Sequence, residues 1–88
     1  MYQSEKEHNK KIILNYLKES GALYKMGNVF HAQKAFMVSS VLQWVLRKVD
    51  SGEYGSGDVS FYLDSMNDFI DNKIRIYWNE EGNLVIGA

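Results

Sequence analysis

The segment from residue 28 to residue 49 constrains the fold most, because apolar side chains cover more than half of the helix that it predicts. At about 100° per residue, its apolar positions form a main stripe and an adjoining flank. The main stripe contains Ala35, Val38, Leu42, Val45, Leu46 and Val49, and the flank contains Phe30, Met37, Val41 and Trp44. A helix with so wide an apolar surface needs cover on two sides. It is therefore either the central element of the fold or half of a subunit interface.

Two further helices and a β-hairpin are expected around this segment. The predicted helices cover about residues 5–20, 28–49 and 58–71, and the predicted strands cover about residues 73–78 and 83–87. Gly21 stands where a glycine commonly ends a helix, and Asn79 to Gly82 suits a type I turn with a glycine bulge. We expect one α+β domain over residues 1–88, with the hairpin packed on the helices. The same order of elements leaves a winged-helix-like arrangement as the alternative.

The first predicted helix is polar at its start. Its first two turns carry almost no apolar residue, and its buried side starts only at Ile12 and Ile13. Because burial of apolar surface is what holds a helix against a small domain, we expect these turns to project from the body or to fray.

Composition excludes several kinds of chemistry. The chain has no cysteine, which rules out disulfides, thiolate catalysis and cysteine-ligated metals. The most apolar run, residues 35–46, is interrupted by polar residues and is too short to span a bilayer. The first residues lack the apolar stretch of a signal peptide. We therefore expect a cytoplasmic protein with no membrane segment.

The net charge of −1 conceals an uneven distribution. Residues 1–48 carry eight basic and three acidic side chains, giving +5, whereas residues 49–88 carry two basic and eight acidic ones, giving −6. The two halves should attract each other, either within one molecule or between two.

The predicted helix over residues 58–71 combines an aromatic residue with acidic ones on its outer face. Phe61 lies roughly 180° from the apolar stripe of this helix, on the side that carries Asp64 and Asp68. Protein interfaces favour an aromatic side chain surrounded by polar groups. We therefore predict a partner-binding surface that contains Phe61, Asp64 and Asp68, with Tyr54 and Tyr77 as further aromatic anchors.

No pattern in the sequence indicates an enzyme or a cofactor. The only histidines are His8 and His31; a polar turn is expected for His8, and a hydrogen-bonded core position for His31. The spacing of Asp64, Asp68 and Asp71 aligns three carboxylates, but a cation site needs further oxygen ligands from elsewhere. The glycine-rich residues 52–58 lack the Gly-Lys-Ser/Thr of a phosphate loop. We expect no metal and no cofactor.

These observations favour a small accessory or regulatory protein that binds a protein partner. A homodimer is also expected, with Met37, Val41 and Trp44 at its contact, because the flank of the central helix needs cover. The alternative is a nucleic-acid-binding regulator that uses the basic N-terminal half. The sequence disfavours it, because the helix that would enter the major groove carries aspartates and no basic residue.

Overall fold

The structure is a computed structural model that describes the backbone of residues 2–25 and 29–87, and the side chains of residues 5–19 and 34–87. This part of the chain forms three helices and a two-stranded antiparallel sheet, which confirms the predicted α+β class. The elements are α1 (Tyr2–Lys25), α2 (Val29–Asp50), α3 (Ser56–Ile70), β1 (Arg75–Trp78) and β2 (Leu84–Gly87). None of the helices is long and apolar enough, over the described residues, to cross a membrane.

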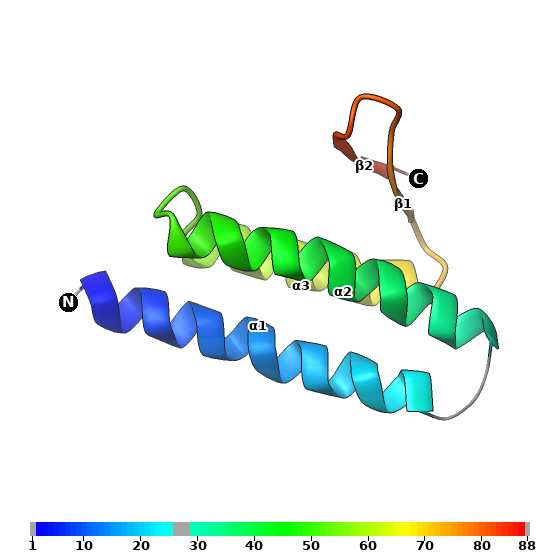
Figure 1. Cartoon of the computed structure of the whole chain (residues 1–88), viewed down its shortest axis with the longest axis horizontal. Helices are drawn as coiled ribbons and strands as arrows, with labels where there is room; N and C mark the ends of the chain where they lie inside the picture. The colour runs from blue at the N-terminus through cyan, green and yellow to red at the C-terminus, as the bar shows by residue number, and fades with distance from the viewer. Residues whose placement is uncertain (1, 26–28, 88) are drawn as a thin grey trace.

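The three helices pack side by side with α2 at the centre of the core. In Figure 1, α1 and α2 run in opposite directions along the length of the molecule, and α3 lies along α2 on the far side of this view. Most of the fully buried apolar side chains come from α2, as its wide stripe predicts. They are Val38, Val41, Leu42, Val45 and Val49, and they meet Ile13 of α1 and Val59 and Met66 of α3.

The hairpin stands beside the helices (Figure 1), and its Trp78 packs edge to face on Trp44 of α2 at 5.8 Å. Its register pairs Ile76 with Ile86 and Trp78 with Leu84, so these four side chains share the inner face, as alternation predicts. The turn is also of the expected kind, because Gly82 has a φ of +80° and donates its amide to the carbonyl of Asn79 at 3.0 Å.

Both predictions about the ends of the first helix are wrong. The helix continues through Gly21 to Lys25, because an interior glycine costs only about 1 kcal/mol relative to alanine. Its first turns do not project from the body, because polar contacts hold them. Lys10 forms an ion pair with Asp50 at 3.0 Å, and Asn9, which is only 3% exposed, donates to the hydroxyl of Ser56 at 3.3 Å.

The connection between the predicted helices over residues 28–49 and 58–71 is shorter than expected and is held by hydrogen bonds. The third helix starts at Ser56 instead of residue 58, which leaves residues 51–55 as the connection. Within it, the amides of Glu53 and Tyr54 both donate to the carbonyl of Lys48, at 2.9 and 3.1 Å. These bonds fix Tyr54 beside the C-terminal end of α2, where its ring meets other aromatic side chains.

Candidate functional site

The outer face of α3 exposes a phenyl ring among carboxylates. Phe61 is 56% exposed, whereas Val59 and Met66 of the same helix are buried in the core. Asp64 is exposed and Asp68 is partly exposed on the same outward side. Neither carboxylate forms an ion pair with a residue whose side chain is described. The face therefore presents apolar surface and negative charge that the described part of the chain leaves unneutralised.

Behind Phe61 the aromatic rings form a continuous cluster. The ring of Phe61 meets the ring of Tyr62 edge to face at 5.2 Å, and Tyr62 stacks on Tyr54 at 5.5 Å. Trp44 lies at the centre, with Tyr54, Tyr62 and Trp78 arranged edge-on around it at 5.7 to 5.9 Å. Each such pair contributes about 0.5–1.5 kcal/mol beyond the burial of its surface. The cluster thus gives the exposed phenyl ring a rigid base.

The polar atoms of this cluster are hydrogen-bonded to one another. The hydroxyls of Tyr54 and Tyr62 lie 3.2 Å apart, and Nε1 of Trp78 donates to the hydroxyl of Ser40 at 3.2 Å. Burial, reinforced by the bond with Tyr54, raises the pKa of Tyr62 far above its ordinary value, so its phenol stays neutral. A shift in this direction opposes acid–base catalysis near neutral pH, for which a phenol with a lowered pKa is needed.

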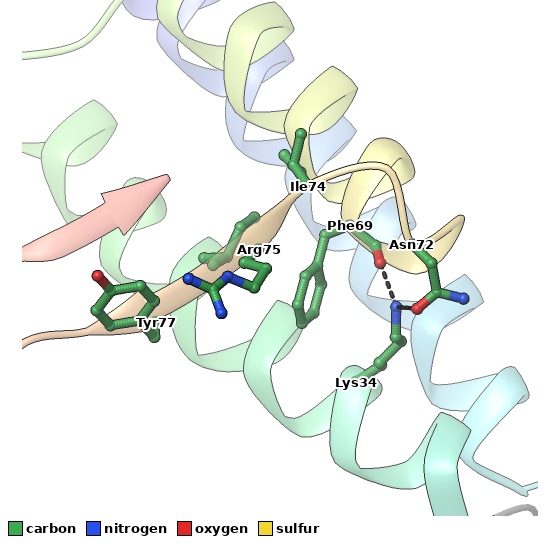
Figure 2. Close-up of a pocket in the computed structure, with 7 residues that line it drawn as sticks. Lys34, Phe69, Asn72, Ile74, Arg75 and Tyr77 are labelled. Carbon is green, nitrogen blue, oxygen red and sulfur yellow. Dashed lines mark hydrogen bonds between the residues drawn. The ribbon is translucent and has the colours of Figure 1, made fainter. Parts of the chain in front are cut away.

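Tyr77, the other predicted anchor, lies elsewhere. It is on the outer face of β1 and lines an open hollow of about 470 Å³ between β1, the end of α3 and the start of α2. Figure 2 shows Tyr77 and Arg75 on the strand, with Phe69 and Lys34 on the opposite side of the hollow. The structure therefore brings Tyr54 and Phe61 into one site and leaves Tyr77 in another.

Lys34 closes the end of α3 at this hollow. Its ammonium donates to the carbonyl of Phe69 and to Oδ1 of Asn72, the latter at 2.7 Å (Figure 2). It also lies 4.7 Å from the centre of the Phe69 ring. Burial lowers the pKa of Lys34, an effect that Asp71 opposes. A cation at a helix C-terminus stabilises the exposed carbonyls, so Lys34 has a structural role here.

The predicted self-association residues are largely covered by the chain itself. Val41 is fully buried, so it has no surface to offer a second molecule in this conformation. Met37 and Trp44 are partly buried against the core, and the hairpin and Tyr54 pack on Trp44. The described part of this flank, Met37, Val41 and Trp44, is therefore partly or fully covered within one chain, and the side chain of Phe30 lies outside the described residues. The homodimer itself stays a prediction.

Two exposed apolar side chains were not predicted from the sequence. Phe36 of α2 is 73% exposed and Leu14 of α1 is 46% exposed. The helical rule places Phe36 in the same polar wedge as Gln43 and Arg47, so its exposure was readable from the sequence. Leu14 likewise falls outside the buried side of α1, between exposed lysines.

No group of three histidine, aspartate or glutamate side chains is arranged to hold a metal ion among the residues that the structure describes. Asp64, Asp68 and Asp71 are accordingly not such a group. His8 is exposed, and the side chain of His31 lies outside the described residues. Comparisons with known protein families, with curated proteins and with solved structures find no match.

Proposed function

We propose that this chain is a small, non-enzymatic accessory or regulatory protein of the cytoplasm, which binds a partner protein through the outer face of α3. The observation that carries the proposal is Phe61, a half-exposed phenyl ring flanked by Asp64 and Asp68, which have no ionic partner among the described residues. Aromatic side chains, phenylalanine among them, are enriched at the core of protein interfaces, where a few anchors supply most of the binding energy.

The chemistry of this face defines the partner. Its complement is a protein surface with an apolar pocket for the phenyl ring and basic side chains around it. Opposite charges at the rim increase the rate of encounter and select the partner, while the buried ring supplies most of the affinity. Tyr62 and Tyr54, which support Phe61 from behind, extend the apolar part of the surface towards Trp44.

The absence of an enzymatic role is also part of the proposal. Support comes from the hydroxyls of the cluster, which bond to each other, and from the raised pKa of Tyr62. The hollow beside Tyr77 is open and is lined by apolar side chains together with Lys34, Asn72 and Arg75. A nucleophile with a general base at hydrogen-bond distance is the usual basis of covalent catalysis, and the described lining of this hollow has no such pair.

The experiment is affinity capture from the source cell with three forms of the chain as bait. The native chain and Phe36→Asp should retain the same partner, whereas Phe61→Asp should lose it. Phe36 is the matched control, because it is an equally bulky and even more exposed phenyl ring on a different helix. Raised salt should also weaken capture, since the proposed rim is ionic. Equal capture by all three baits would refute the proposal.

A further inference from the structure

A second helix face of this chain has the chemistry that the α3 face requires. On α1, Leu14 is 46% exposed and lies between Lys11 and Lys18, which are both exposed. Neither lysine forms an ion pair with a residue whose side chain is described. We call Lys11, Leu14 and Lys18 the basic face of α1. This face places an apolar side chain between two cations, and Glu7, at its N-terminal end, pairs with Lys10 at 3.8 Å. The α3 face, by contrast, places the aromatic ring of Phe61 beside two anions, Asp64 and Asp68.

Both faces carry their charges at helical spacing. Lys11 and Lys18 are separated by seven residues, which is two helical turns or about 10 Å along the axis. Asp64 and Asp68 are separated by four residues, which is about one turn or about 6 Å. Because the side chain of lysine is long and flexible, each lysine reaches one of the two carboxylates when the faces lie along each other.

The two faces cannot meet within one molecule. α1 packs against its own α3 through its other side, where the hydroxyl of Tyr16 donates to Oδ1 of Asn67 at 2.5 Å and Asn9 contacts Ser56. Lys11, Leu14 and Lys18 are on the side of α1 that points away from these contacts. The other exposed lysine-rich side of α1 is already occupied, because Lys6 and Lys10 both bind Asp50.

We propose that the occupant of the α3 face is the basic face of α1 of a second copy of this chain. The inference rests on the proposed function, since it names the partner for that same surface. The contact joins two unlike surfaces, so it either occurs twice in a two-fold dimer or continues into a longer series of molecules. Both forms are salt-sensitive, because exposed charge pairs are screened within about 8 Å at physiological ionic strength.

The test is a charge exchange followed by sedimentation equilibrium. One variant carries Lys11→Glu and Lys18→Glu, and the other carries Asp64→Lys and Asp68→Lys. Each variant alone has two faces of like charge and should sediment as a monomer at a concentration at which the native chain associates. An equimolar mixture should associate again, because each variant supplies the face that the other lacks. Circular dichroism confirms that both variants are folded.

Matched controls separate this contact from a general effect of net charge. Arg47→Glu with Arg75→Glu changes the net charge as the first variant does, and Glu80→Lys with Glu81→Lys changes it as the second does, all at exposed positions outside both faces. Both controls should associate as the native chain does. The inference is overturned if the controls lose association as well, or if the mixture of the two variants stays monomeric.

The outcomes also separate the inference from the proposed function. If the native chain is monomeric but captures another protein in a manner that depends on Phe61, the inference fails and the proposed function stands. If the native chain associates through neither face and capture is indifferent to Phe61, both fail.

Discussion

Phe61 and Met66 lie on opposite sides of α3 and should respond in opposite ways to truncation. Phe61→Ala should change the free energy of unfolding by no more than about 0.5 kcal/mol, as is usual for an exposed side chain. Met66→Ala should cost about 2–5 kcal/mol, because Met66 is fully buried among Val38, Val45 and their neighbours. Urea-induced unfolding of the two variants measures both values.

A loss for Phe61→Ala as large as that for Met66→Ala would contradict this assignment. Phe61 would then be a core residue, and the aromatic feature of the α3 face would disappear. Phe36→Ala provides the matched control, because it also removes an exposed phenyl ring from a helix and should be equally mild.

At the scale of residues, the helical period of about 100° per residue predicts which side chains of α3 face outward. It does not predict which polar side chains are buried. Phe61 falls on the outside as expected. Asn9 and Ser65 are buried although they are polar. Asn9 lies on the same side of α1 as Ile13, but its residue type does not indicate burial. The partner of Asn9 is Ser56, which is far away in sequence, and only the packing of α1 on α3 brings the two together.

The contact between α1 and α3 should give the stability a specific dependence on alkaline pH. Burial, with Glu19 and Asp71 nearby, raises the pKa of Tyr16 from 10.0 to about 12. The folded chain therefore keeps this proton at a pH at which the unfolded chain releases it. Its contribution to stability is complete below pH 10.0 and is lost as the pH rises towards about 12.

Tyr16→Phe tests this account of the α1–α3 contact. Near neutral pH the variant should be less stable by about 0.5–1.5 kcal/mol, because the hydrogen bond to Asn67 is gone. Its stability should also fall less steeply than that of the native chain above pH 10.0. Urea unfolding over a series of pH values measures both effects, and equal alkaline slopes would show that the Tyr16 phenol is not responsible.

The hairpin turn depends on the backbone of Gly82. Its φ of +80° is strained for any residue with a side chain, so Gly82→Ala should cost about 1–2 kcal/mol of stability. Gly87→Ala is the matched control, since Gly87 has no positive φ and nothing lies within 4 Å of the added carbon. Thermal or urea unfolding compares them. A similar cost for both variants would argue against a turn that requires glycine.

At the scale of elements, local signals predict the cores of the helices and strands well and predict their ends poorly. Ile76 and Trp78 alternate with residues that face outward. This alternation predicts the inner face of β1, and the structure pairs the two residues with Ile86 and Leu84 of β2. Gly21 does not mark the end of α1, which continues to Lys25. An interior glycine destabilises a helix only slightly, so the backbone hydrogen bonds continue past it. The start of α1 is held by Asp50, a residue of another helix.

The uneven charge of the molecule is partly neutralised inside the chain. Lys10 pairs with Asp50, which lowers the pKa of that carboxylate, mainly through the hydrogen bond from Lys10. Lys6 donates to the carbonyl of Asp50 as well. These contacts occupy two of the four lysines of α1 on which the nucleic-acid alternative depends, namely Lys6, Lys10, Lys11 and Lys18.

We therefore predict no submicromolar binding to duplex DNA or single-stranded RNA at about 150 mM salt, where counterion release contributes less. A fluorescence titration with labelled duplex and single strand measures this. Tight binding that disappears on Lys10→Glu with Lys11→Glu would favour the nucleic-acid alternative instead. Lys73→Glu with Arg75→Glu is the charge-matched control, outside α1.

At the scale of the whole molecule, the central place of α2 follows from the sequence because its apolar surface is too wide for a single neighbour. What covers its second flank does not follow. The choice between a second copy and the chain's own hairpin depends on where β1 and Trp78 fold back, and the structure places Trp78 against Trp44. The self-association that we propose uses the charged faces of α1 and α3 in place of that flank.

The most direct measurement of the central claim is the dissociation constant of the complex formed through α3, whether with a captured protein or with a second copy. Phe61→Ala should weaken it about 30-fold, which corresponds to about 2 kcal/mol, while Phe36→Ala should leave it unchanged. Titration calorimetry on the three forms gives the values. If Phe61→Ala binds as tightly as the native chain, the outer face of α3 is not the interaction surface.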